Sequence, residues 1–108
     1  MLDDTVDWIV SQVESIGLST SAFSADEVSG NGYTPLAPLY VGAFQGSADI
    51  ADELVFNGPE NFGPITHLLF RNSSGLWFTR EVNGTPESFD ENGMLALSSA
   101  PISIIFAP

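Results

Sequence analysis

The spacing of apolar residues changes at Gly17, and this change constrains the fold more than any other feature of the sequence. Before it, apolar residues recur three or four positions apart, which is typical of a helix with one buried face. After it, short apolar runs alternate with clusters of Gly, Pro, Asn, Asp and Ser, as strands alternate with turns. The pattern predicts one helix followed by a β domain.

The helix is expected over Leu2 to Ile16. Asp3 or Asp4 is placed to cap its start, and Gly17 to end it. Trp8 lies off the apolar stripe, which makes it a candidate interface residue; burial under a neighbouring loop is the alternative. We therefore divide the chain into residues 1–16, a helix that packs on or docks the domain, and residues 17–108.

The second part is expected to be a small antiparallel β-sandwich, Ig-like or jelly-roll-like, because it offers many short strands separated by turns. With 108 residues and 44% hydrophobic content, the chain can build one core. Pro35 and Pro38 lack the N–H that a central strand needs, so their segment belongs at an edge or bulge. The expected strands are Gly17 to Phe23, Tyr33 to Gln45, Glu53 to Asn57, Ile65 to Arg71, Leu76 to Val82, Glu87 to Phe89, Met94 to Leu97 and Ile102 to Phe106.

Alternation within two of these strands predicts their surroundings. Leu76, Phe78 and Val82 share one face, so Trp77 is expected outside the main core, beside polar neighbours. Ile65 to Arg71 is apolar on both faces, as in a strand covered on both sides.

The charge balance limits the partners. Fourteen acidic residues face two arginines, a formal net charge of −12. Grooves for nucleic acid and anionic membrane surfaces need Lys and Arg, so neither is expected as a partner. No apolar run approaches the ~20 residues that span a bilayer, and the acidic first residues are unlike a secretory signal, so a soluble protein without an export signal is expected. A neutral or basic protein surface fits better, or the acids only maintain solubility.

His67 is the one histidine, and it decides between an enzyme and a structural protein. It shares a strand face with Ile65 and Leu69, and the sequence has no Gly-x-Ser-x-Gly motif or other nucleophile signature. We therefore expect a buried or half-buried structural histidine and no enzymatic activity. No cofactor or metal is expected either, because the acidic turns at 49–53 and 90–92 do not follow the EF-hand pattern.

Three segments carry a resemblance to a known family. They are "EVSGNGY", "ELVFNGPENFGPITHLLFRNSSGLWF" and "ESFDENGMLALSSAPISIIF". Together they resemble small tailed-bacteriophage virion proteins, often labelled tail fibre proteins. Gly63, Thr66 and His67 match the family pattern, and Phe62 stands where the family usually has Trp. Leu69, Arg71 and Pro64 depart from the pattern.

This resemblance implies a virion protein, assembled in the host cytoplasm, with no catalytic residues to transfer. Its partners would be major capsid or tail proteins, and it would form a homo-oligomer or stand in many copies on a lattice as a capsid decoration or tail component. Phe62, Gly63, Thr66 and His67 would be structural.

The contacts are expected from aromatic and apolar residues, because aromatic anchors carry much interface energy. They are Trp8, Trp77, Leu36, Leu39 and Tyr40, for each of which ordinary burial is the alternative. A carbohydrate or host-surface binding module, with Trp77 or Tyr40 stacked on sugar rings, is the alternative function.

Overall fold

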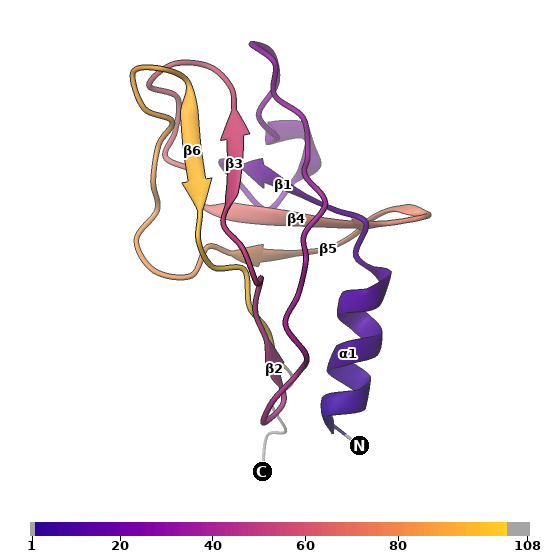
Figure 1. The fold of residues 1–108 in the computed structure, drawn as a ribbon. Coiled ribbons are helices and arrows are strands. Elements are labelled where there is room, and N and C mark those ends of the chain that lie inside the picture. The colour runs from indigo at the N-terminus through magenta and orange to yellow at the C-terminus, as the bar shows by residue number, and fades with distance from the viewer. Residues whose placement is uncertain (1, 104–108) are drawn as a thin grey trace.

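The computed structural model describes residues 2–103 and has the mainly-β class expected from the sequence, with one N-terminal helix and antiparallel pairing (Figure 1). Beyond Ser103, the expected strand to Phe106 lies outside the described residues. The described elements are α1 (Leu2–Gln12), β1 (Ser15–Ser19), η1 (Ser24–Asp26), β2 (Ser47–Ala48), β3 (Leu54–Asn57), β4 (His67–Asn72), β5 (Gly75–Glu81), β6 (Met94–Leu97) and β7 (Ile102–Ser103).

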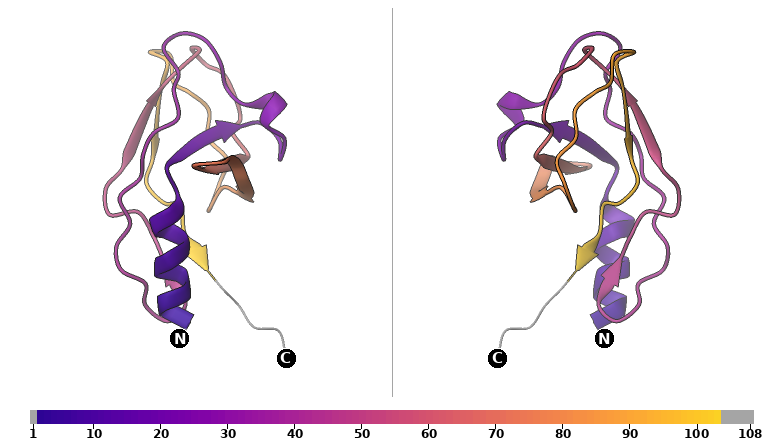
Figure 2. Two further views of the ribbon diagram at one scale, coloured as in Figure 1. Left: turned by 90° about the vertical axis from the view of Figure 1, so that its right-hand side faces the viewer. Right: turned by 90° about the vertical axis from the view of Figure 1, so that its left-hand side faces the viewer.

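Two layers enclose the core. One is the sheet β1-β4-β5, and the other is the pair β3-β6, whose strands run across the first layer (Figure 1). A third pair, β2-β7, lies below them beside α1 (Figures 1 and 2). Phe70 from the first layer and Phe56 from the second are both fully buried in one shared cluster. This cluster is the single core that the composition predicts.

The strand β4 is buried on both faces, as expected. Leu68, Leu69 and Phe70 are consecutive, so their side chains alternate between faces, yet all three are buried. The sheet is therefore covered on both sides along this stretch.

The helix ends earlier than predicted. It stops at Gln12, and the Glu14 N–H donates to the Arg71 carbonyl at 2.8 Å. Ile16 and Gly17 consequently belong to β1, where Gly17 lies opposite Leu69, and Gly17 does not end the helix. Pairing with β4 replaced the last helical turn.

The prediction of a strand at Tyr33 to Gln45 is wrong, because the segment forms no continuous strand. The segment instead makes isolated bridges, at Leu36 with Ile16, Tyr40 with Ile50 and Phe44 with Ser47. Pro35 and Pro38 have no backbone N–H, so they cannot donate the hydrogen bonds of a continuous β-ladder. The strand expected at Glu87 to Phe89 is likewise reduced to one bridge, between Glu87 and Ile65.

Acidic residues attach α1 to the rest of the fold. An Asp3 carboxylate oxygen accepts from the Gly46 N–H at 2.6 Å, and one from Asp7 accepts from the Ala43 N–H at 2.7 Å. Asp3 thus binds a distant loop rather than simply capping its own helix. In the part of the chain that the structure describes, no helix has the length and apolar character needed to cross a membrane.

Candidate functional site

Two tryptophans meet at the surface between α1 and β5. The Trp8 side chain is 59% exposed, and its ring centroid lies 6.2 Å from that of Trp77, with the planes at 89°. The Trp77 ring also makes an edge contact with Phe78, at 5.3 Å. The structure therefore brings together two residues that the sequence nominated separately, and one of them stays open to solvent.

A β-bulge places Trp77. Phe70 pairs with Phe78 and Arg71 with Leu76, so Trp77 is an extra residue that β4 does not match. A bulge changes the alternation of side chains. As a result Leu76 is 44% exposed, although it was expected to share an inward face with Phe78. Trp77 is half-buried and packs against the core, although it was expected outside it.

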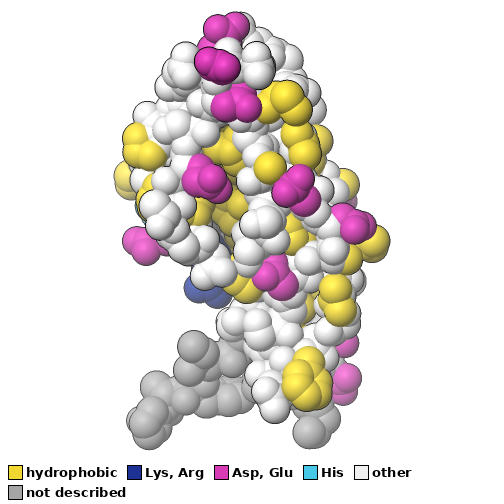
Figure 3. Space-filling view, turned by 60° about the vertical axis from the view of Figure 1, so that its left-hand side comes forward, with side chains coloured by type: hydrophobic (Ala, Val, Ile, Leu, Met, Phe, Trp, Pro, Cys, Tyr) yellow, Lys and Arg dark blue, Asp and Glu magenta, His cyan; other side chains and the backbone are white. Residues whose placement is uncertain are grey.

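A groove of about 340 Å³ runs beside this pair. It is lined by Ile9 of α1, residues 77–80 of β5, and Ile102 and Ser103 of β7. The lining contains no carboxylate, although the chain has fourteen. The groove is therefore a mostly apolar site on a strongly acidic protein; Figure 3 shows how Asp and Glu side chains are scattered over one face of the molecule.

Arg80 is the charged residue of this groove. Its guanidinium lies over the Phe78 ring, 5.7 Å from the centroid, which is within the range of a cation–π contact. Among the described residues it makes no ion pair. Arg80 thus keeps its hydrogen-bond donors available for a partner.

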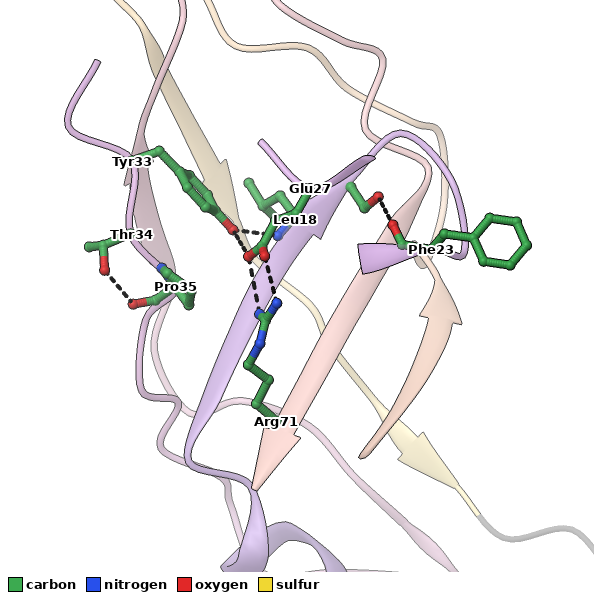
Figure 4. A network of polar contacts seen from close by, with 8 residues as sticks. Leu18, Phe23, Glu27, Tyr33, Thr34, Pro35 and Arg71 are labelled. Carbon is green, nitrogen blue, oxygen red and sulfur yellow. Dashed lines mark hydrogen bonds and ion pairs between the residues drawn. The ribbon is translucent and has the colours of Figure 1, made fainter. Parts of the chain in front are cut away.

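Arg71, the other arginine, is fully engaged inside the fold. Its guanidinium donates two hydrogen bonds to the Glu27 carboxylate, at 2.6 and 3.1 Å, and the Tyr33 hydroxyl donates to the same carboxylate at 2.8 Å (Figure 4). The Tyr33 oxygen in turn accepts from the Leu18 N–H. Burial raises the pKa of Tyr33 above its usual range. This network fastens the loop before Tyr33 to β1 and β4.

The remaining interface candidates divide into two groups. Leu36 and Tyr40 are half-buried and pack against the core, and the Tyr40 hydroxyl donates to the Ala100 carbonyl at 2.7 Å. Leu39 is 65% exposed, and Val41 and Phe44 on the same segment are also exposed. The outward side of residues 39–44 is thus a second apolar surface, to which Leu36 and Tyr40 contribute little.

His67 is half-buried and lies at the first position of β4. Its Nδ1 lies 2.8 Å from Thr66 Oγ1, and both residues line a hollow of about 310 Å³ that Glu81 also lines. A hydroxyl, an imidazole and a carboxylate therefore share one site. Among the described residues no hydrogen bond joins His67 to Glu81.

Three further residues named from the resemblance, Thr66, Gly63 and Phe62, make backbone contacts or lie close to neighbouring backbone. The Thr66 backbone donates to Ser19 and accepts from Val82, which joins three strands. Gly63 has a φ of 148°, and a Cβ there would lie 2.8 Å from the Ser88 Cα, so a larger residue would not fit. Phe62 is 38% exposed, and its carbonyl accepts from the Phe89 N–H.

A wide polar hollow of about 480 Å³ lies at the end of β3 and the start of β6. It is lined by Asn31, Gly32, Asn57, Gly58, Glu60, Asn92 and Gly93. No group of three or more His, Cys, Asp or Glu among residues 2–103 could hold a metal ion. The polar side chains of this hollow are therefore three amides and the Glu60 carboxylate.

Sequence reasoning missed Arg80 and this hollow. Arg80 could have been nominated from the sequence, because it is one of only two basic residues among fourteen acidic ones. The hollow is formed by three turns that are far apart in the sequence, and no local sequence pattern predicts that these turns come together.

Comparison with known proteins gives no neighbour for this chain: no family model, no curated protein and no solved structure matches it.

Proposed function

We propose that this chain is a structural subunit of a bacteriophage virion. It would be a small accessory domain on the particle surface, decorating the capsid or forming part of the tail or fibre. It would be assembled in the host cytoplasm and present in many copies. The family resemblance supplies the virion assignment. The exposed Trp8 beside Trp77 is the observation that supports a docking role.

Physical chemistry favours docking at this surface. Tryptophan and arginine are the residues most enriched among those that dominate binding energy. Trp77 and Arg80 line one groove, and Trp8 contacts Trp77 beside it. Many copies on a lattice would let each contact be modest, because neighbouring copies raise the effective concentration.

The decisive experiment is quantitative mass spectrometry of purified particles of the source virus. We expect this polypeptide at many copies per particle, and fewer when Trp8 is replaced by Ala. The control is Val55→Ala, an exposed apolar residue of β3 outside both the groove and the surface of residues 39–44. Particles that lack the polypeptide would refute the assignment.

A carbohydrate-binding module is the second candidate, and one observation favours it. The polar hollow presents Asn31, Asn57 and Asn92, whose side-chain amides make no hydrogen bond among the described residues and could both donate to and accept from sugar hydroxyls. Glycan-array binding that is lost on Asn92→Ala but kept on Trp77→Ala would place a sugar in this hollow. Loss on Trp77→Ala alone would instead favour stacking at the groove.

A further inference from the structure

The groove beside β5 lies at the edge of a strand rather than over one face of a sheet. Successive side chains of a strand point to opposite faces, so a hollow over one face contacts every second residue. This groove is lined by the consecutive residues Trp77, Phe78, Thr79 and Arg80. Even without the bulged Trp77, three consecutive residues line it. Its long wall is therefore the free edge of β5.

The backbone direction along β5 supports this geometry. β5 is the outer strand of its sheet, with β4 as its paired neighbour. The Val82 N–H donates to the Thr66 carbonyl at 2.9 Å. In an antiparallel ladder, residues alternate between facing the partner and facing away. Counting back from Val82, Arg80 and Phe78 face β4, whereas Glu81 and Thr79 face outward.

These outward groups have no backbone partner among the described residues. Free strand edges normally carry protection such as Lys, Pro or a covering element. β5 has the bulge at Trp77 and two charged side chains, Arg80 and Glu81, but neither Lys nor Pro. The outward N–H and C=O of Thr79 thus lie at the groove, and those of Glu81 follow just beyond it.

We infer that this edge accepts an extended segment of another protein, which adds a strand to β5. The inference rests on the proposed docking function and specifies its mode. Backbone hydrogen bonds would give affinity, and side-chain pockets would give selectivity. The walls from Ile9, Phe78 and Ile102 favour apolar side chains at alternate positions of the segment, and Arg80 favours a carboxylate beside them.

Charge argues for a foreign segment rather than a second copy of this chain. Two copies would each bring a formal charge of −12, and like charges oppose association. A segment with one carboxylate, carried by a protein that is otherwise neutral or basic, satisfies Arg80 and is attracted to the rest of the surface.

The test uses a displayed library of random octapeptides, selected against the full chain. We expect enrichment of sequences with apolar residues at alternate positions and one Asp or Glu. With a synthetic peptide of the enriched sequence, hydrogen exchange should slow at the Thr79 and Glu81 amides. Enriched peptides without this pattern, or protection elsewhere, would overturn the inference.

Two matched variants sharpen the test. Thr79→Pro removes one outward donor and no bond to β4, and we expect peptide affinity to fall about tenfold. Thr79→Val keeps the N–H and the side-chain shape, so its affinity should stay close to that of the unaltered chain. If Thr79→Pro fails to fold, Arg80→Gln replaces it: the affinity for the acidic peptide should fall, and the salt dependence of binding should weaken.

Other occupants give distinct results. Self-association that Thr79→Pro abolishes would mean that a second copy fills the edge, and exchange protection already present in the isolated monomer would mean that the chain fills it itself. Either result overturns the inference. Particles that contain the protein while the peptides fail would refute strand addition but leave the virion assignment standing.

Discussion

The surroundings of the two arginines differ in how completely the fold uses their charge. The Arg71 guanidinium is paired with the Glu27 carboxylate, which also accepts a hydrogen bond from Tyr33, so the charge of Arg71 is neutralised within the fold. Arg80 lies over Phe78 at a groove without carboxylates and makes no ion pair among residues 2–103. In a chain with fourteen acidic residues, an arginine left unpaired suggests recognition. The first region should govern stability, and the second should govern binding.

The largest loss of stability is expected from Glu27→Ala. It leaves Arg71 partly buried without its partner and removes the acceptor of the Tyr33 hydroxyl, so the free energy of unfolding should fall by about 2–4 kcal/mol. Urea unfolding measures this, with the exposed Glu91→Gln as control. A loss below that of the control would mean that the network does not hold the loop.

A smaller loss is expected from Gly17→Ala. A Cβ at this position would collide with Glu27 Oε2 and lie 2.9 Å from Arg71 Nη1. Overpacking of this kind typically costs about 1–3 kcal/mol. The matched control is Gly42→Ala, where no heavy atom lies within 4 Å of the added Cβ. Thermal unfolding of both variants should separate them; equal melting temperatures would show that the network can move aside.

Alkaline pH should weaken the Tyr33 network and the separate contact of Tyr40 with Ala100. Burial raises the pKa of Tyr33 and of Tyr40 above the ordinary value of 10.0, so both favour the protonated form when folded. Their contribution is fully present below pH 10 and declines as the pH rises from there towards the folded pKa values. Between pH 9 and 11 the urea midpoint of the unaltered chain should therefore fall. The midpoint of Tyr33→Phe should fall by less over the same range. An identical decline in both would contradict this assignment.

Trp8→Ala should have a minor effect on folding. The ring is 59% exposed, and its edge contact with Trp77 is worth about 1 kcal/mol or less. Differential scanning calorimetry should detect a small shift, while incorporation into particles falls strongly. A loss of several kcal/mol would show instead that Trp8 belongs to the core.

The smallest change is expected from Arg80→Gln. Without an ion pair among the described residues to lose, the free energy of unfolding should change by about 0.5 kcal/mol or less. Urea unfolding beside Glu27→Ala gives the direct comparison. If the two variants lose similar stability, the contrast between the two arginines is wrong.

Local sequence patterns predicted the elements whose own residues determine them. The helical spacing before Gly17 indicated α1, and the apolar run around Leu68 indicated a strand covered on both faces. The strand at Met94–Leu97 was confirmed at both ends. In each case the information lies within a few residues of the element.

Long-range pairings set the features that the sequence did not reveal. Alternation alone placed Trp77 outside the core, and the bulge opposite β4 moved it. The helix lost its last turn because Glu14 bonds to Arg71, 57 positions away in the chain. For the candidate site, Trp8 and Trp77 could be nominated, but their contact depends on how α1 lies against β5.

The contact between the tryptophan rings also determines what spectroscopy can detect. The chain contains two tryptophans, and their rings meet beside the groove where docking is proposed. Indole fluorescence will therefore report the approach of a ligand and any separation of α1 from β5. It will say little about the phenylalanine-rich interior, so a fluorescence melt that precedes the loss of circular dichroism would signal a loosened surface above an intact core.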